Sequence, residues 1–409
     1  MLKAPTRHIT LDELAIDSAP LELDEDTRLA LESTRLVVVR GAGHGKWKLI
    51  PNGLVGAVQI DNLLVEVKPK DKVGISQILF LLSYAKDPGF RPQNVEAETT
   101  EDLWAALGET LARLGERATS RGVLQGYVSQ DEALRTVRGR IRMSDQVTHR
   151  PGFMFPIEVT HDEYTIDVPE NRILRAAVRR MLVVPKLDVE VRRRLLHLDR
   201  KLADVSSLVR GHRLPQWTPS RLNAAYVPAL RIAEVVLRNM VAEASPGKLH
   251  VASFVVNMAK VFEDFVTMAL TEALRKYPGR TVAQYKTYMD EPCSDGTPGI
   301  VLKPDIVHFV DGEATLIFDA KYKSASANGQ YPNADHYQML AYATAMDRTN
   351  AWLIYADSGM PTRRRVRNSE IFVHEYPIDL SGRPSEVLAR VDYLAKSSFT
   401  TVFVEHPII

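Results

Sequence analysis

The stretch KPDIVHFVDGEATLIFDAKYK, at residues 303–323, constrains the fold of this chain more than any other stretch. Two apolar runs flank an Asp-Gly pair, a pattern that predicts two β-strands joined by a tight turn. The runs also carry charged residues where a core would take apolar ones, Asp305 in the first and Asp319 with Lys321 in the second. Charged groups that are kept in a core require a chemical reason.

The face on which each charged group lies follows from the alternation of side chains along a strand. Asp319 and Lys321 are two positions apart, so they share one face. Asp305 shares that face if the connection at Asp311-Gly312 has an odd number of residues, whereas a two-residue turn would separate Asp305 from Asp319. The sequence leaves this parity open.

Two converging carboxylates with a lysine beside them suit a site for a divalent cation. Mg²⁺ prefers oxygen ligands and keeps several of its waters, and Mn²⁺ can take its place. Such an ion polarises a phosphoryl oxygen and lowers the pKa of a bound water. The lysine could stabilise the charge of the transition state, or orient or deprotonate the attacking water. A solvated Asp–Lys pair on an exposed hairpin is the alternative.

A third acidic residue comes from the segment before the hairpin. Apolar residues recur at helical spacing through FVVNMAKVFEDFVTMALTEAL and predict one helix over about 251–276. Glu263 lies at the edge of the apolar face of this helix, whereas Asp264 lies beside Lys260, as a solvated acid would. An inward carboxylate needs a cation or hydrogen-bond donors. A buried Glu–Arg pair is the alternative to a place in the site.

The segment after the hairpin adds two polar residues to the candidate set. HYQMLAYA predicts a helix over 335–346, in which Gln338 and Tyr342 share one face. By itself Gln338 is better explained as a surface glutamine. A strand is expected at 350–356.

Composition and motifs exclude several classes of site. Lys and Arg number 52 against 51 Asp and Glu, which leaves a net charge of +1 and confines any basic surface to local patches. Cys293 is the only cysteine, which excludes an internal disulfide and a cysteine-built zinc site. RLVVVRGAGHGKWK is not a phosphate-binding loop, because Arg40 replaces the first glycine and Trp47 replaces the Ser or Thr. We expect this chain not to hydrolyse nucleotides.

Changes in periodicity predict a multidomain chain of α+β and α/β type. The three expected segments are residues 1–120, 121–245 and 246–409. The N-terminal half begins β-rich, between 35 and 70, and then becomes helical. Its other elements are expected at 74–85, 101–119, 123–128, 136–143, 169–183, 188–204 and 224–243.

The stretch EASPGKLH, at 243–250, is the expected linker to a C-terminal α/β domain with a mixed central sheet. The N-terminus is acidic and carries no secretory h-region, and the apolar clusters are too short to span a bilayer. We therefore expect a cytoplasmic protein without a membrane partner.

Two clusters of arginines could form local basic surfaces. VRGRIRM would set Arg138, Arg140 and Arg142 on one strand face, as a ridge for a partner or for DNA phosphates. A solvated strand edge is the alternative. TRRRVR, at 362–367, is expected to be a loop close enough to the C-terminal domain to contact DNA.

The order of acidic helix, Pro-Asp strand, Asp-Ala-Lys strand and Gln-x-x-x-Tyr helix resembles the PD-(D/E)xK nuclease superfamily. The resemblance covers about residues 250–400 and implies the restriction-endonuclease-like fold. The matching residues are Glu263, Pro304-Asp305, Asp319-Ala320-Lys321, Gln338 and Tyr342.

Stretches ahead of this module resemble the N-terminal half of McrC proteins, the nuclease subunits of McrBC-type modification-dependent restriction systems. They are VGAVQIDNLLVEVKPK, GYVSQDEALRTVRGRIRM, HDEYTIDVPENRILRAAVRRML and RLNAAYVPALRIAEVVL, in this order. The first 30 residues match no part of the family.

The resemblance implies a Mg²⁺-dependent DNA endonuclease subunit that docks through its N-terminal half on a hexameric McrB-like AAA+ GTPase and stimulates GTP hydrolysis. It assigns metal ligands and catalytic groups to Asp305, Asp319, the Ala320 carbonyl, Glu263, Lys321 and Gln338. Two other functions stay open: a non-catalytic adaptor that activates a partner NTPase, and a standalone DNA nuclease. Loss of an acidic residue or of the lysine would favour the adaptor, and none is lost.

Overall fold

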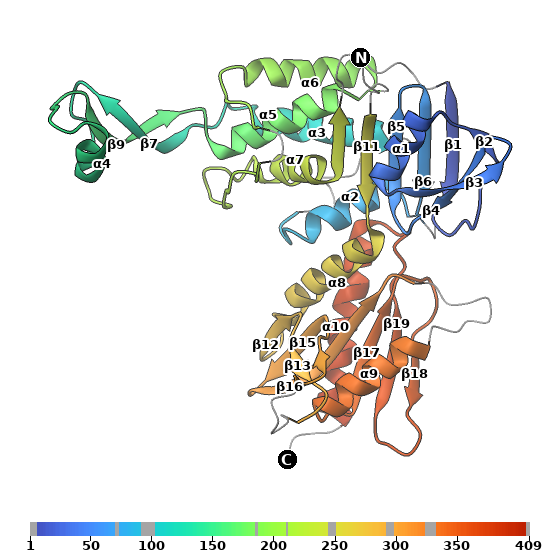
Figure 1. Ribbon diagram of the computed structural model, residues 1–409. Helices are drawn as coiled ribbons and strands as arrows, with labels where there is room; N and C mark the ends of the chain where they lie inside the picture. The colour runs from blue at the N-terminus through green and yellow to red at the C-terminus, as the bar shows by residue number, and fades with distance from the viewer. Residues whose placement is uncertain are drawn as a thin grey trace. The chain divides into compact units, whose positions relative to one another are not determined.

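The chain folds into two compact units in the computed structural model (Figure 1). One unit comprises Met1–Ala106 with Val241–Ile409, and the other comprises Leu107–Met240. This grouping differs from the three consecutive segments expected from the sequence. The described residues are 6–69, 73–90, 103–184, 187–209, 212–243, 251–291, 298–323 and 333–405. Cys293 and residues 244–250 of the expected linker lie outside them.

The N-terminal part of the first unit is built mainly from strands. Its elements are β1 (Arg7–Asp12), β2 (Leu21–Glu22), α1 (Glu25–Thr34), β3 (Val37–Gly43), β4 (Lys46–Pro51), β5 (Val55–Ile60), β6 (Leu63–Lys68) and α2 (Ile75–Tyr84). The glycine-rich stretch RGAGHGK connects β3 to β4, which pair antiparallel. It therefore forms a hairpin turn, as the sequence predicts.

The C-terminal part of the first unit contains a six-stranded mixed sheet in the order β12-β15-β16-β17-β19-β18 (Figure 1). Its elements are α8 (Met258–Leu274), β12 (Arg280–Ala283), β13 (Thr287–Tyr288), β14 (Val301–Leu302), β15 (Ile306–Val310), β16 (Glu313–Lys321), α9 (Asn333–Ala345), β17 (Asn350–Tyr355), β18 (Thr362–Arg365), β19 (Phe372–Pro377) and α10 (Pro384–Glu405). The expected mixed α/β architecture is confirmed.

Helices cover both faces of this sheet. Ile317 of β16 packs in one apolar cluster with Met339 and Tyr342 of α9, so α9 covers the face to which Ile317 points. Tyr322, just after β16, has the opposite parity and contacts the ring of Phe262 of α8 at 6.2 Å between centroids. Helices α8 and α10 both contact β16 and cover that second face (Figure 1).

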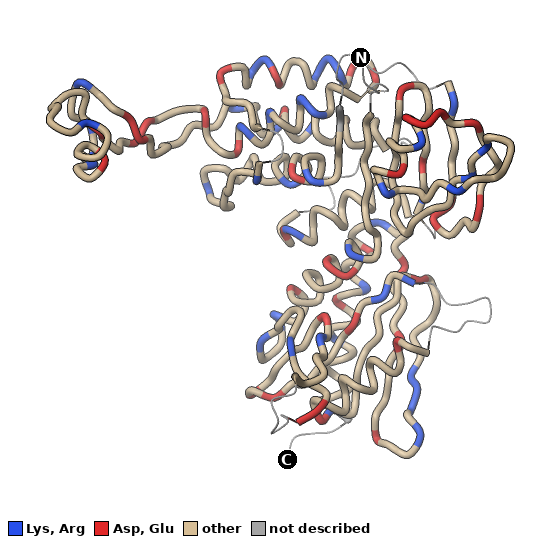
Figure 2. Tube along the Cα trace, in the orientation of Figure 1, with Lys and Arg blue, Asp and Glu red and all other residues tan. Residues whose placement is uncertain are grey.

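The TRRRVR cluster is an edge strand and not the expected loop. Thr362–Arg365 form β18, which pairs antiparallel with β19 (Figure 2). Arg364 Nε contacts the buried carboxylate of Glu375 at 2.6 Å, and Arg365 Nη2 contacts Glu370 at 2.5 Å. Two of these arginines thus already have acidic partners, which reduces the net basic charge of the edge.

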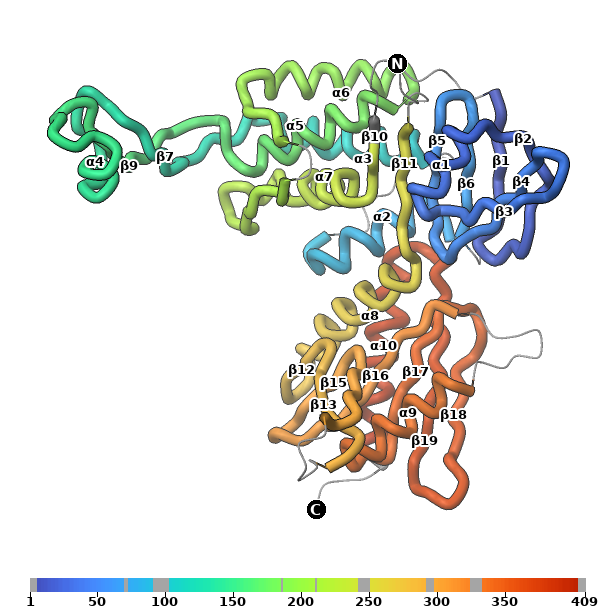
Figure 3. Tube along the Cα trace, viewed as in Figure 1, coloured from blue at the N-terminus to red at the C-terminus, as the bar shows by residue number. Residues whose placement is uncertain are grey.

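The helix expected over 251–276 is wrong at its start. VASFVV forms the strand β11 (Val251–Val256), which pairs antiparallel with β5 in the sheet β1-β6-β5-β11-β10 (Figure 3). A short run rich in β-branched residues suits a central strand, and apolar periodicity alone does not distinguish it from a buried helix. Asn257 ends the ambiguity, because its side chain accepts a hydrogen bond from Lys260 N and caps α8.

The second unit combines helices with a β-hairpin that extends away from them (Figure 1). Its elements are most of α3 (Leu103–Ala118), then β7 (Gly126–Leu134), β8 (Arg140–Ile141), α4 (Met143–His149), β9 (Ile157–Thr165), α5 (Pro169–Leu182), α6 (Val189–Lys201) and α7 (Val227–Asn239). At Met240 the chain leaves α7 and forms β10 (Met240–Glu243), so the helix expected to reach 243 ends earlier.

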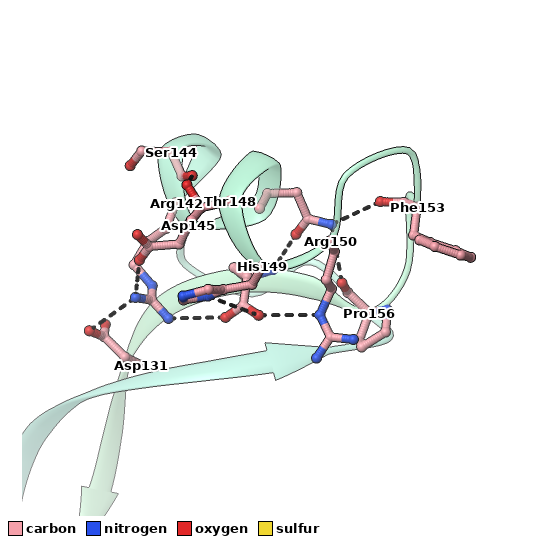
Figure 4. Close-up of polar contacts among 11 residues, drawn as sticks. Asp131, Arg142, Ser144, Asp145, Thr148, His149, Arg150, Phe153 and Pro156 are labelled. Atoms are coloured by element: carbon pink, nitrogen blue, oxygen red, sulfur yellow. Dashed lines mark hydrogen bonds and ion pairs between the residues drawn. The ribbon is translucent and has the colours of Figure 1, made fainter.

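The arginine ridge expected at 138–142 does not form. Only Arg140 and Ile141 make up β8, and Arg142 precedes α4. Its Nη2 contacts the buried carboxylate of Glu158 at 3.1 Å, which Arg150 Nε also contacts, at 3.2 Å (Figure 4). This network holds α4 against β9 and uses Arg142 internally.

The end of the hairpin, residues 141–155, exposes large apolar side chains, and we call it the arm tip. Five of its apolar side chains are more than half exposed: Met143, Val147, Phe153, Met154 and Phe155. A cluster of exposed apolar groups of this kind is typical of a protein-contact surface. Among the described residues of the whole chain, no helix is long and apolar enough to span a membrane.

Candidate active site

The turn of the β15–β16 hairpin has two residues. Asp311 and Gly312 connect the last residue of β15 to the first of β16, with φ angles of 52° and 88°. Both therefore adopt the left-handed backbone of a tight hairpin turn, which the Asp-Gly pair favours. By alternation alone, a turn of this length would place Asp305 and Asp319 on opposite faces.

A β-bulge restores the alignment of the two carboxylates. The register shifts between His308 and Phe309, where Thr315 of β16 is an extra residue. Beyond the bulge, the continuing register places Asp305 directly opposite Asp319. The two residues are therefore cross-strand neighbours on one face, the face that α9 covers.

Asp305 is held by two neutral donors. Ala320 N donates to its Oδ2 at 2.9 Å, and Gln284 Nε2 donates to its Oδ1 at 2.7 Å. Burial raises the pKa of Asp305 against the effect of the Ala320 amide, and the charge of Glu263 raises it further. These two donors fix the orientation of the carboxylate and add no positive charge to it.

Asp319 is the most buried carboxylate of the site, with 1% of its surface exposed. Burial, followed by the charge of Asp305, raises its pKa to about 7. Lys321 Nζ lies 2.5 Å from Asp319 Oδ2, yet that oxygen has no partner in hydrogen-bond geometry. Burial alone would lower the pKa of Lys321, but the charge and hydrogen bond of Asp319, together with the charges of Asp305 and Asp335, outweigh burial and raise the pKa.

Glu263 of α8 reaches the site through a glutamine. Its Oε1 accepts from Gln284 Nε2 at 2.9 Å and from Lys260 Nζ at 3.0 Å. The partners of Glu263 are therefore a glutamine and a lysine, and the buried Glu–Arg pair considered as the alternative does not form. Gln284 was missed in the sequence because it follows an edge strand and belongs to no motif, and its contacts depend on the register of β12 with β15.

Gln338 and Tyr342 share a face of α9, as expected. Gln338 Nε2 donates to the Tyr342 hydroxyl at 2.6 Å, so the contact of Gln338 with the site runs through Tyr342. Burial and then the charge of Asp319 raise the pKa of Tyr342. Tyr342 therefore lies close enough to Asp319 for an electrostatic interaction between the two side chains.

Asp335 is a second residue that the sequence did not reveal. It lies in the first turn of α9 with 4% of its surface exposed, and Lys323 Nζ contacts it at 2.8 Å. Its charge also contributes to the raised pKa of Asp319, after burial and Asp305. Its position three residues before Gln338, on the same helical face, is the signal that could have revealed it.

The described side chains contain no group of three or more His, Cys, Asp and Glu residues that could hold a metal ion. The available oxygen donors are the carboxylates of Asp305 and Asp319, with the carbonyl of Ala320 next to Asp319 in the chain. These fit Mg²⁺ better than a transition metal, because Mg²⁺ is bound through one or two carboxylates and keeps its other waters. The buried Asp319 Oδ2, without a hydrogen-bond donor in good geometry, is the observation that most favours a cation here.

Comparisons with known proteins agree with each other. A model of the family described as "McrBC 5-methylcytosine restriction system component" matches residues 49–356. Among solved structures, the McrC chain in a refined half-complex of Thermococcus gammatolerans McrB AAA+ hexamers with bound McrC aligns with a TM-score of 0.60. The sequence identity is 18%, and the alignment covers 95% of this chain and 99% of that chain. This likeness shows a shared fold.

Two further solved structures are more distant. A chain of the T. gammatolerans McrBC complex, solved by cryo-electron microscopy, has a TM-score of 0.40 at 18% identity over 66% of this chain and 89% of its own. Protein VC1899 from Vibrio cholerae has a TM-score of 0.26 at 10% identity over 80% of this chain and 56% of its own. No curated protein matches the sequence.

Proposed function

Because the chain belongs to the family of McrBC 5-methylcytosine restriction system components, we propose that it is the Mg²⁺-dependent DNA endonuclease subunit of a modification-dependent restriction complex. It would hydrolyse DNA phosphodiester bonds in the cytoplasm, within a C-terminal module of the restriction-endonuclease-like fold. The observation that carries this proposal is the buried pair Asp305–Asp319, aligned across the hairpin and flanked by Lys321.

The carboxylates of Asp305 and Asp319 and the carbonyl of Ala320 would hold the cation. When bound, Mg²⁺ or Mn²⁺ supplies Lewis acidity toward a phosphate oxygen and lowers the pKa of a coordinated water. Glu263 and Gln338 would contribute indirectly. Glu263 accepts a hydrogen bond from Gln284, and Gln338 donates one to Tyr342.

Lys321 contributes as a cation. Its raised pKa keeps the ammonium protonated at neutral pH, so it does not serve as the general base in this state. An ammonium beside two carboxylates can donate hydrogen bonds to a phosphate oxygen or orient the attacking water, and both roles stabilise the negative charge that develops during hydrolysis.

The energy source would lie on another chain. This chain turns its glycine-rich stretch into a hairpin between β3 and β4, and the related T. gammatolerans structure contains McrB AAA+ hexamers with bound McrC. We propose a McrB-like AAA+ GTPase ring as the partner, docked on residues ahead of the C-terminal module. The exposed apolar side chains of the arm tip support a protein-contact surface in that part of the chain.

The decisive experiment measures cleavage of modified DNA and GTP turnover together, in the complex with the partner ring and Mg²⁺. Asp319→Asn and Lys321→Ala should abolish cleavage while GTP turnover stays at the wild-type level. Asp264→Asn is the matched control, because this carboxylate contacts Lys260 on α8 outside the candidate site. Cleavage by the two site variants at the wild-type rate would overturn the assignment.

The same experiment separates the two other functions. A chain that raises GTP turnover but never cleaves DNA, with every candidate group intact, is the non-catalytic adaptor. A chain that cleaves DNA equally well without the ring is a standalone nuclease.

A further inference from the structure

Gln284 occupies an unusual place beside the two acidic residues that the hairpin and α8 supply. It follows β12, and its backbone N donates to Asp305 O at 2.8 Å, which continues the pairing of β12 with β15. Its φ of 51° lies in the left-handed region, which is uncommon for a residue with a side chain. Strained backbone of this kind persists where the surroundings require one side-chain direction.

The side-chain amide of Gln284 bridges two carboxylates. Nε2 donates to Glu263 Oε1 at 2.9 Å and to Asp305 Oδ1 at 2.7 Å, which uses both of its hydrogens. The orientation of the amide follows from chemistry, because both neighbours are acceptors and only the NH₂ end can face them. The bridge fixes the separation of Glu263 from Asp305.

The bridge is neutral, and this distinguishes it from the other contacts of the acidic groups. Lys260 partly neutralises Glu263 from the solvent side, and Lys321 neutralises Asp319. Gln284 brings Glu263 and Asp305 together without adding a positive charge. The negative potential that attracts a divalent cation is thereby retained at Asp305.

Holding the edge strand in place does not require this side chain. Strand β12 is already paired with β15 over Arg280–Ala283, and Thr281 Oγ1 bonds His308 Nδ1 at 2.9 Å on the same edge. The amide bridge therefore has a role beyond strand pairing.

We propose that Gln284 is a positioning residue for the cation, a neutral clamp that orients Asp305 as a metal ligand and holds Glu263 beside it. This inference rests on the proposed metal-dependent function and adds a residue that belongs to none of the recognised motif positions. Outer-shell hydrogen bonds to ligating carboxylates typically change metal affinity or activity by about 10- to 100-fold.

The test uses the full-length chain with Gln284→Leu, which removes both hydrogen bonds at similar volume. Mn²⁺ affinity is measured by electron paramagnetic resonance without DNA, and cleavage is measured against Mg²⁺ concentration in the complex. We expect the Mn²⁺ affinity to fall about 10-fold or more, while cleavage at saturating Mg²⁺ stays within about threefold of wild type. Thr281→Val is the control for a lost hydrogen bond on the same strand and should leave the affinity unchanged.

A second variant separates positioning from simple adhesion. Gln284→Lys can donate to both carboxylates but adds a positive charge, so it should keep the melting temperature near the wild-type value while the Mn²⁺ affinity is low. Wild-type Mn²⁺ affinity in Gln284→Leu or in Gln284→Lys would overturn the inference. Failure of the proposed function gives a different result, because the wild-type chain would then bind no Mn²⁺ and Asp319→Asn would not change cleavage.

Discussion

Removing the charge of Asp319 should flatten the pH dependence of stability in the metal-free protein. In the folded chain the pKa of Asp319 is about 7, against an ordinary value of 3.8. Between these pH values the folded chain keeps a proton that the unfolded chain has released. The contribution of Asp319 to the free energy of unfolding is therefore greatest below pH 3.8 and is lost as the pH rises through 7.

The size of the effect follows from the same two values. The full difference corresponds to about 4 kcal/mol of unfolding free energy, of which about 2 to 3 kcal/mol is lost between about pH 5 and pH 8. Asp319→Asn has no proton to lose in this range, so its unfolding free energy should vary less by that amount. The ion pair with Lys321 forms only when Asp319 is ionised, and its effect is already contained in the pKa of about 7, so it adds no separate contribution to the difference.

The assay is urea unfolding followed by fluorescence and circular dichroism between about pH 5 and pH 8, in EDTA and again in Mg²⁺. The Asp264→Asn variant retains Asp319 and the other candidate carboxylates, and serves as the baseline. Saturating Mg²⁺ should flatten the wild-type curve as well, because a cation stabilises the ionised carboxylate. Parallel curves for wild type and Asp319→Asn in EDTA, within about 0.5 kcal/mol, would show that Asp319 is ionised at neutral pH and would refute the reasoning.

Three further predictions concern other parts of the chain. Gly56→Ala should destabilise the five-stranded sheet by about 2 to 4 kcal/mol in urea unfolding, since its Cβ would lie 1.9 Å from Phe254 O; a loss under about 1 kcal/mol would contradict this packing. Met154→Asp at the arm tip should weaken binding to the partner ring about 10-fold or more in a pull-down titration, whereas the equally exposed Val189→Asp on α6 should not. EDTA should stop DNA cleavage and excess Mg²⁺ should restore it, and cleavage that persists in EDTA would exclude the metal site.

The hairpin and its charged residues could be predicted because turn chemistry and strand periodicity are local. The Asp-Gly pair and the alternation along β16 are visible in the sequence, and the structure forms both. The face of Asp305 could not be predicted, since the bulge at Thr315 carries no sequence signature and changes the parity of the pairing. Contacts that depend on the register between distant segments, such as those of Gln284, could not be predicted from the sequence either.

The helix expected from 251 failed for a different reason. VASFVV and the residues after it are apolar enough to continue a helical pattern, and only pairing with β5 selects the strand. This correction has a practical result, because a fragment ending at 245 would lack the strand between β5 and β10. A fragment meant to retain the N-terminal sheet should extend through Val256.

Whether Asp305 and Asp319 share a face depends on whether the number of residues between them along the hairpin, not counting the bulged Thr315, is odd or even. With the turn held in place, loss of Thr315 would remove the bulge and leave Asp305 opposite Asp319. Loss of one residue between Thr315 and Asp319, with the bulge kept, would instead turn Asp319 and Lys321 to the face of β16 that α8 and α10 cover, while the strands could still pair. Insertions or deletions between Thr315 and Asp319 should therefore be tolerated during evolution only in steps of two, or when loss of the bulge offsets them. A single-residue deletion there that loss of the bulge does not offset would leave the strands paired but would place Asp319 and Asp305 on opposite faces of the sheet.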